Sequence, residues 1–428
     1  MPDAQPSSAA TASSSGYDAI VVGASLAGCA TAILLGRAGA RVALVEKQPD
    51  PAAFKRICSH MIQASAVPTL ERLDLLGPIE AAGGVRSRLH ARTPWGWVEA
   101  PPEQAAHAVN LRREVLDPLL RDAAATAPGV ELTLGRTAER LLSENGAVRG
   151  VTVRNRNGEE TELRAPLTVG ADGRESRIAE LAGVTAKTLP HNRFVYAAYF
   201  EGARPAEQPD AWTWMLNPQF AAAFPTDGGL TLYVAMLTKD RLPEFKRDPE
   251  RALVDFVAAV PDPPPIRDGR LVGSMLGKLE MPNRVRVPSA PGLALVGDAA
   301  LATDPLFGVG CGWALQSGEW LADSVAPALR GTEPLAKGLA RYRRRHRREL
   351  RGHAFFINDY ATGRRFNPIE RAMMAAAVRD PKIASGFDAY ATRQIKPSRM
   401  VARLAPRTIA VHARRAIGAA RPQRPKLP

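Results

Sequence analysis

The first part of the chain alternates apolar and small polar stretches in a regular order. An apolar β-branched run at residues 19–22 leads into a loop of small residues, and an uncharged segment rich in Ala and Leu follows at 26–35. A second apolar run ends near residue 46. A strand, a tight turn, a helix and a second strand in this order form a dinucleotide-binding unit. A membrane span is the weaker interpretation, because a span needs about twenty apolar residues and the uncharged stretch 19–36 contains three glycines.

The loop between the first strand and the helix has the spacing of a phosphate-binding turn. Gly23, Ser25 and Gly28 occupy the three places of G-x-G-x-x-G, and Ala27 lies among them. Gly23 permits the turn, a small residue at 25 lets backbone N–H groups approach a pyrophosphate, and Gly28 lets the helix pack closely. Glu46 ends the second strand, where a carboxylate can accept hydrogen bonds from ribose hydroxyls.

Two further loops are also rich in small residues, and each follows an apolar strand. The first reads G-A-D-G-R-E-S at residues 170–176, and the second reads G-D-A-A-L-A-T-D-P at 297–305. Glycines 308, 310 and 312 then open a long helical pattern. The three loops predict one site built from distant parts of the chain.

The stretches between these loops differ in their periodicity. Helical spacing of apolar residues appears at 65–76 and at 110–125, and Arg113 lies in the first turn of the second helix. Asn145-Gly146 and Asn157-Gly158 are hairpin signals inside an antiparallel excursion. From about 189 to 273 alternating strands and aromatic residues dominate, and after residue 339 helical patterns do.

Composition and charge exclude several classes of protein. The hydrophobic fraction is 45% and the charged fraction 23%, which is typical of globular domains. The net charge of +14 lies in one region: from Arg341 onward there are 22 basic and 5 acidic residues, and the rest of the chain is slightly acidic. No nucleic-acid-binding module accompanies this basic region, so we expect no nucleic-acid partner. Three distant cysteines without C-x-x-C predict neither a disulfide framework nor a metal site, and favour a cytoplasmic location.

The three loops, in this order and spacing, resemble the FAD-dependent aromatic hydroxylase family of flavoprotein monooxygenases and its relatives, the flavin halogenases and geranylgeranyl reductases. The resemblance covers residues 17–327. It implies an α/β fold whose FAD-binding domain is Rossmann-like and has three layers, two of β-sheet and one of helices (ββα). This domain carries an inserted β-rich substrate domain and a helical C-terminal region. We divide the chain into a disordered leader (1–16), an FAD-binding domain in two parts (17–188 and 287–335), a β-rich substrate domain (189–286) and a basic helical region (336–428).

The resemblance also implies roles for individual residues outside the first loop. Asp298 would accept a hydrogen bond from the FAD ribityl chain, Gly308 and Gly310 would place backbone amides near the flavin, and Pro305 would lie beside its ring. Arg113 matches an arginine that faces the cofactor, and a surface arginine is the alternative. Asp172 and Gly173 match a second fingerprint credited with supporting FAD and NAD(P)H, and a simple strand-to-helix turn is the alternative.

The resemblance implies chemistry carried mainly by the cofactor. Reduced FAD reacts with molecular oxygen to form a C4a-hydroperoxide, and the protein supplies orientation and a dry pocket. No obligatory catalytic side chain marks the sequence. His60, Arg56 and Trp214 are candidates for the pocket, and a structural role for each is the alternative.

The motifs leave the exact reaction open. We expect a monooxygenase that hydroxylates or epoxidises an aromatic or polyketide-like small molecule, with NAD(P)H as electron donor. Reduction of C=C bonds, as in geranylgeranyl reductases, is an alternative. Halogenation is another, although Trp212 and Trp214 match the halogenase W-x-W-x-I-P pattern only in part, and between residues 48 and 110 the single lysine is Lys55.

The basic C-terminal region adds a hypothesis of a different class. Arginine-rich helices at 341–351 and 399–415 could bind an acidic carrier protein or an anionic membrane surface, or could simply be solvated. A non-catalytic flavin-binding module is the remaining alternative.

Overall fold

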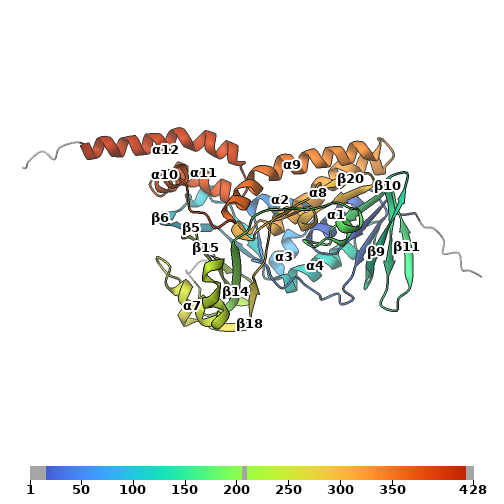
Figure 1. Ribbon diagram of the computed structural model, residues 1–428, viewed down its shortest axis with the longest axis horizontal. Helices are drawn as coiled ribbons and strands as arrows, with labels where there is room; N and C mark the ends of the chain where they lie inside the picture. The colour runs from blue at the N-terminus through green and yellow to red at the C-terminus, as the bar shows by residue number, and fades with distance from the viewer. Residues whose placement is uncertain (1–15, 205–209, 421–428) are drawn as a thin grey trace, which may run out of the picture.

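The computed structural model of the protein describes residues 16–204 and 210–420. The predicted leader, residues 1–16, therefore lies outside the described residues except for Gly16. Two large sheets and a group of C-terminal helices make up the described chain (Figure 1).

A six-stranded sheet forms the centre of the first part. Every neighbouring pair of strands is parallel except β20 with β21. In spatial order the strands are β20 (Ser289–Ala290), β21 (Leu293–Leu295), β12 (Leu167–Gly170), β1 (Ala19–Val22), β2 (Val42–Glu46) and β8 (Val130–Leu134).

This sheet is the middle of three layers. Val21 and Leu44 point to one face, which is covered by α1 (Leu26–Arg37), α4 (Arg113–Ala125) and α8 (Gly310–Leu329). Ile20 and Val45 point to the other face, where they pack against Val151 of a second sheet. That sheet contains β9 (Thr137–Glu144), β10 (Ala147–Arg154) and β11 (Glu160–Arg164). The predicted three-layer ββα architecture is confirmed.

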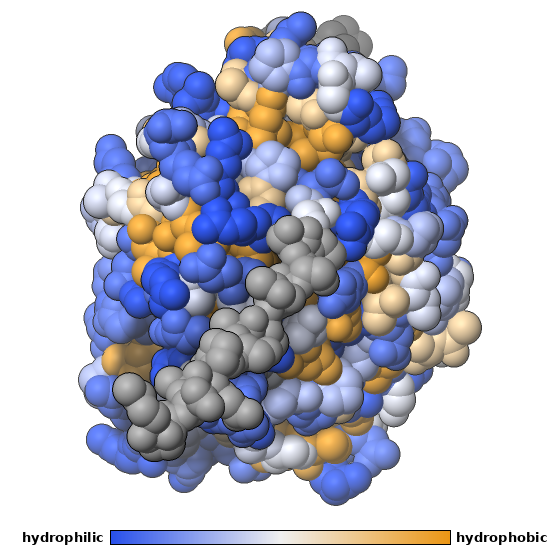
Figure 2. All heavy atoms as spheres, turned by 90° about the vertical axis from the view of Figure 1, so that its right-hand side faces the viewer, coloured by the Kyte–Doolittle hydropathy of each residue, from blue (hydrophilic) through white to orange (hydrophobic). Residues whose placement is uncertain are grey.

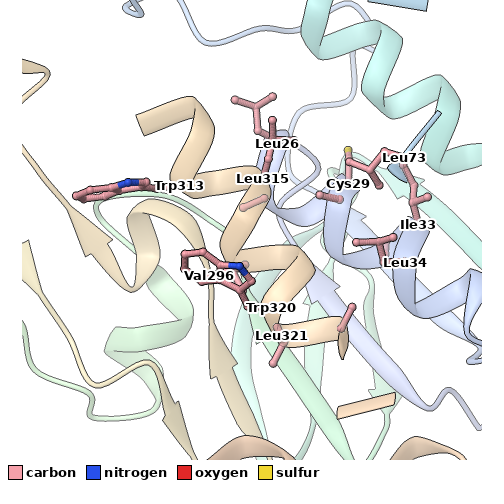
Figure 3. Close-up of a cluster of buried hydrophobic side chains, with 14 of the residues drawn as sticks. Leu26, Cys29, Ile33, Leu34, Leu73, Val296, Trp313, Leu315, Trp320 and Leu321 are labelled. Atoms are coloured by element: carbon pink, nitrogen blue, oxygen red, sulfur yellow. The ribbon is translucent and has the colours of Figure 1, made fainter. Parts of the chain in front are cut away.

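The helical layer is closely packed because its residues are small or aliphatic. Cys29 and Ile33 of α1 lie near Leu315 and Leu321 of α8, and all four are at most 1% exposed (Figure 3). Gly318 of α8 allows this approach, since a Cβ there would lie 2.9 Å from the carbonyl oxygen of Ala27. Burial of such apolar side chains stabilises the layer by about 1.5–3 kcal/mol for each large one.

A seven-stranded sheet forms the second part. In spatial order it contains β18 (Arg270–Lys278), β14 (Arg193–Glu201), β17 (Leu230–Thr238), β16 (Phe220–Pro225), β15 (Ala211–Met215), β5 (Leu89–Thr93) and β6 (Gly96–Val98). The pair β15 and β5 is parallel. The predicted boundaries 189–286 are therefore corrected: two strands come from residues 89–98, because β5 pairs in register with a strand more than a hundred residues later.

Helices cover both faces of this sheet. Trp214 and Tyr233 point to the face covered by α6 (Leu242–Arg247) and α7 (Pro249–Ala258). Met215 and Val234 point to the opposite face, as the two-residue period of a strand requires. There they meet helices of the C-terminal region, α10 (Pro368–Ala377), α11 (Pro381–Ala391) and α12 (Pro397–Ala420).

The basic C-terminal region is helical, as expected. The long helix α9 (Leu335–Tyr360) and α12 run along the same side of the molecule (Figure 1). Asn367 and Glu370 form a reciprocal capping box that starts α10, and the Asp380 carboxylate caps α11. Within residues 16–204 and 210–420, no helix is both long and apolar enough to cross a membrane. The side of the molecule near β9–β11, at the right of Figure 1, presents a mostly hydrophilic face with scattered apolar patches (Figure 2).

Shorter elements connect the two large sheets. The helix expected at 65–76 is broken into α2 (Val67–Arg72) and α3 (Leu76–Ala81), because Asp74 adopts a left-handed backbone with φ of 57°. Two three-stranded sheets and one short helix complete the fold: β3 (Met61–Ile62), β7 (Ala108–Asn110) and β4 (Val85–Ser87); β13 (Lys187–Thr188), β19 (Arg284–Val285) and β22 (Leu301–Ala302); and α5 (Arg177–Leu181).

Candidate functional site

The first glycine loop can accept only glycine at two of its positions. Gly23 has φ of 108°, and a Cβ added to Gly28 would lie 1.8 Å from the Gly23 carbonyl oxygen. Ser25 precedes α1 with an extended backbone, and its side chain makes no capping hydrogen bond. The first turn of α1 carries no acidic side chain, so its N–H groups and dipole are left for an anion.

Glu46 stands beside this loop at the end of β2. Its Oε2 accepts the Ala24 N–H at 2.8 Å, and its Oε1 accepts the Gln48 N–H at 2.9 Å. A carboxylate has about four acceptor positions, so two remain for ribose hydroxyls. The loop geometry therefore holds this carboxylate in place for the predicted role.

Arg113 is buried beneath the same loop. Its Nη2 donates to the Ser25 hydroxyl at 2.7 Å and to Asp117 Oδ1 at 2.6 Å, and the arginine is 2% exposed. Burial opposes the charge, but the Asp117 carboxylate together with Cys58 and Cys311 outweighs burial and keeps the pKa of Arg113 above its usual value. The alternative of a surface arginine is wrong.

Two cysteines meet beside this arginine. Cys58 Sγ lies 3.4 Å from Cys311 Sγ, and it accepts the His60 N–H at 3.3 Å. The hydrogen bond from Cys311 lowers the pKa of Cys58 well below that of an ordinary thiol. His60 and Arg113 act in the same direction, and burial acts in the opposite direction. The pKa of Cys311 is raised, since it holds the shared proton next to a thiolate. No sequence pattern indicates this pair, because 253 residues separate the two cysteines.

His60 is a buried member of a hydrogen-bond chain. Its Nδ1 accepts the Arg113 backbone N–H at 3.2 Å, so the ring proton lies on Nε2 and is donated to the Tyr199 hydroxyl. The two rings also stack. His60 therefore joins the loop after β2 to strand β14, at the boundary between the two large sheets.

The second and third loops differ in how their aspartates are used. Asp172 accepts the Ser176 hydroxyl at 2.6 Å and the Ile178 N–H at 2.9 Å, so it stabilises the turn into α5. Gly173, with φ of 85°, faces open space. Asp298 is partly exposed and pairs with the Lys55 ammonium at 3.2 Å.

The loop after the third strand has an irregular backbone. Phe307 and Gly308 both have positive φ, 69° and 60°. Leu306 N–H donates to Asp304 at 2.8 Å, and Gln63 Nε2 donates to the Phe307 carbonyl oxygen at 2.6 Å, so both sides of the loop are held. A Cβ on Gly310 would meet nothing within 4 Å, which leaves space at the start of α8.

An apolar cavity lies against this loop. The empty space between its lining atoms is about 940 Å³, and this figure includes the part that is open to solvent. The lining combines the 305–308 loop with one face of the seven-stranded sheet and with α9–α12. It contains six methionines and six phenylalanine or tyrosine rings besides Phe307: Met61, Met215, Met236, Met373, Met374, Met400, Phe220, Phe224, Phe356, Tyr360, Phe387 and Tyr390.

The three pocket candidates from the sequence do not line this cavity. Trp214 is 1% exposed and packs on the opposite face of its sheet, where its Nε1 donates to the Pro261 carbonyl oxygen. The expectation for Trp214 is thus corrected, because the period of β15 turns Thr213 and Met215 to the cavity instead. Arg56 is exposed, and His60 lies between two lining residues, Ser59 and Met61.

The residues around the three loops fit FAD. The glycine positions exclude side chains where a pyrophosphate would approach, the α1 N-terminus is uncapped by a side chain, and space is left at Gly310. A family model described as an FAD binding domain matches residues 16–352. The chain belongs to this FAD-binding family. The protein is an FAD-dependent oxidoreductase of the superfamily that includes flavin monooxygenases, halogenases and geranylgeranyl reductases.

Two relatives by sequence are named as reductases. The chain is 29% identical to the digeranylgeranylglycerophospholipid reductase of Methanocella arvoryzae over 335 residues, which cover 76% of this chain and 81% of the relative. It is 26% identical to the enzyme of the same name from Thermoplasma acidophilum over 336 residues, 76% of this chain and 82% of the relative.

Solved structures with the same fold have other activities. The flavin-dependent brominase Bmp2 superposes with a TM-score of 0.77 over 94% of this chain and 100% of its own, at 17% identity. The p-nitrophenol 4-monooxygenase PnpA from Pseudomonas putida superposes with a TM-score of 0.70 over 89% of this chain and 99% of its own, at 21% identity. At these identities the likeness shows the fold alone.

Proposed function

We propose that this oxidoreductase is a monooxygenase that inserts one atom of molecular oxygen into a large apolar, aromatic or polyketide-like molecule. The observation that carries the proposal is the cavity beside the 305–308 loop, with its methionine and aromatic lining. Bound FAD would take electrons from NAD(P)H and pass them to oxygen. An apolar lining limits the access of water to such chemistry.

The residues of the chain have positioning roles in this proposal. The α1 N-terminus and Gly28 would receive the pyrophosphate, Glu46 the ribose, and Asp298 the ribityl chain. Gln63 and Asp304 hold the 305–308 loop from both sides, so its backbone is fixed before a substrate binds. Aromatic rings such as Phe220 and Phe387 supply flat apolar surfaces for a ring system.

A second candidate is the reduction of C=C bonds in an isoprenoid. The two named relatives, at 29% and 26% identity, favour it, and a cavity rich in methionine also suits a flexible hydrocarbon chain. Halogenation is disfavoured. Among the described residues no lysine lines the cavity, Lys55 is paired with Asp298, and Trp212 and Trp214 lie on the far side of the sheet.

One experiment separates the two leading candidates. The FAD-loaded protein is reduced with NADPH without oxygen, supplied with a polycyclic phenol or with geranylgeranyl glycerol ether, and then exposed to ¹⁸O₂. A product that gains one ¹⁸O atom supports the monooxygenase. A product that gains two hydrogens before oxygen is added supports the reductase and overturns the first proposal.

A further inference from the structure

Arg393 is the one arginine in the lining of the cavity. It follows the end of α11, where its φ of 65° gives a left-handed backbone that usually belongs to glycine or asparagine. This conformation turns the chain back towards the 305–308 loop, and Arg393 Cζ lies 5.6 Å from the centre of the Phe307 ring. The arginine therefore sits at the end of the cavity next to the predicted flavin position.

Only part of the Arg393 guanidinium is used by the protein. Nη1 donates to the Tyr390 carbonyl oxygen at 3.3 Å and lies 3.1 Å from His353 Nδ1. Burial and the Arg393 charge lower the pKa of His353 to about 3, so its ring is neutral and Nδ1 accepts this hydrogen bond. The rings of Phe307 and Tyr390 flank the cation at 5.6 and 5.5 Å.

The other edge of the guanidinium is buried without a partner. Among the described residues neither Nε nor Nη2 makes a hydrogen bond, although neither atom reaches solvent. The one carboxylate in the cavity lining, Glu370, is already taken: it accepts both Nη1 and Nη2 of Arg364 at 2.7 Å. A buried cation without a counterion is costly, so a retained one needs a partner that arrives from outside.

We infer that Arg393 binds an anionic group with two oxygens, a carboxylate or a phosphate, on an otherwise apolar substrate. Nε–H and one Nη2–H point the same way from the edge of the guanidinium, which is the geometry that receives two oxygens at once. Because neither atom is accessible in the empty cavity, the flanking side chains, which include Phe307 and Tyr390, must shift when the anion binds. The substrate is then an amphiphile whose anionic end lies at the 305–308 loop and whose body fills the methionine and aromatic part of the cavity. This inference rests on the proposed function only in taking the cavity as the substrate site.

The test measures binding, not turnover. The oxidised, FAD-loaded protein is titrated in a calorimeter with 2-naphthoate, 2-naphthyl phosphate and the neutral 2-naphthamide, in the absence of NADPH. We expect at least one of the anions to bind about tenfold tighter than the amide, because two charge-assisted hydrogen bonds form. The tighter of the two anions tells whether a carboxylate or a phosphate is the natural group.

Variants connect this preference to Arg393. Arg393→Leu should bind the anions and the amide alike, and Arg393→Lys should retain a reduced preference, since it keeps the charge and loses the paired donors. Arg379→Leu is the control, because that guanidinium donates to the Ala375 carbonyl oxygen and does not line the cavity. It should leave the preference unchanged.

Two results would overturn the inference: equal binding of anions and amide by the unaltered protein, or a preference that survives Arg393→Leu. If Arg393→Leu does not fold, the comparison of the three probes on the unaltered protein still shows whether the cavity prefers an anion. Because no reductant is present, no turnover takes place in this test. Failure of the oxygenation experiment therefore leaves the binding result intact, and failure of the binding test leaves the oxygenation result intact.

Discussion

The sulfur atoms of Cys58 and Cys311 lie 3.4 Å apart at the start of α8, beside the buried Arg113 and Asp117 ion pair. One cysteine comes from the irregular loop after β2, and the other follows the glycines of the third loop. Their contact joins the first and last parts of the FAD-binding domain directly at the predicted flavin site.

This contact predicts an unusually reactive thiol. Because the pKa of Cys58 is lowered, we expect its alkylation by iodoacetamide to slow far less between pH 8 and pH 6 than the roughly hundredfold of an ordinary thiol. Mass spectrometry of the labelled peptide gives the rate. FAD should protect the residue, and Cys58→Ser should remove the fast reaction. A hundredfold loss of rate over this range would contradict the lowered pKa.

The glycine loops predict separate effects on folding and on cofactor binding. Gly310→Ala should weaken FAD binding about tenfold or more without lowering the stability of the FAD-free protein, since the added methyl meets only the space left for the cofactor. Gly28→Ala should prevent correct folding, because its Cβ collides with the Gly23 carbonyl oxygen. Fluorescence titration with FAD and urea unfolding measure the two effects.

Gly77→Ala is the matched control for these variants. Gly77 lies in α3 with open space around it, so alanine should raise the free energy of unfolding by about 0.5–1 kcal/mol and leave FAD affinity unchanged. A loss of FAD affinity in this variant would show that the effect of Gly310→Ala is not local.

The His60 and Tyr199 contact should contribute to stability across the boundary between the two large sheets. Tyr199→Phe removes one buried hydrogen bond and should lower the free energy of unfolding by about 1 kcal/mol. His60→Ala also leaves the Arg113 N–H unpaired and should cost about 2–3 kcal/mol. Tyr17→Phe, at an exposed hydrogen bond, should change stability by less than about 0.5 kcal/mol. Equal effects of the two tyrosine variants would refute this role.

Asp388 of α11 predicts a pH dependence of stability. Burial raises its pKa to about 6, so the folded protein holds a proton that the unfolded chain has released. The stabilisation of the folded state that comes from the raised pKa of Asp388 is complete below about pH 4 and is lost as the pH rises through about 6. Asp388→Asn should therefore gain about 3 kcal/mol relative to the unaltered protein between pH 4 and pH 8, in urea unfolding. A difference that does not vary with pH would contradict the raised pKa.

The parts of the fold that follow from local spacing could be predicted from the sequence. Gly23, Gly28 and Glu46 lie within one βαβ unit, so their geometry depends on neighbours in the chain. The Asn145-Gly146 turn is likewise local, and both residues have the positive φ that it requires. The three-layer fold and the FAD cofactor are implied by the resemblance of the three loops to a known family, which local spacing alone does not provide.

The pocket could not be reached by the same reasoning. Arg393, Phe307 and Met215 come from segments that only the tertiary fold brings together. The face that Trp214 occupies depends on the register of β15 with β5, which its own pattern of residues does not contain. A buried, unpaired arginine also has no sequence signature, because an arginine in a basic region most often faces solvent.

The C-terminal helices also show why a simple truncation would mislead. Met400 and Leu404 of α12 are buried in the apolar cluster that also contains residues of α10 and α11, while Val401 and Ile409 are exposed. Removing the helix would open the cavity and would not isolate a docking role. A carrier protein or membrane surface as partner for this region stays a prediction.

Rapid mixing of the reduced enzyme with oxygen tests the central claim most directly. The FAD-loaded protein is reduced by NADPH without oxygen and mixed with oxygenated buffer while the flavin spectrum is recorded, with and without 2-naphthoate. We predict a third spectral species between the reduced and the oxidised flavin, because the apolar cavity keeps water from the site. Reoxidation in a single step, with no such species under either condition, would contradict a monooxygenase and favour the reduction of C=C bonds.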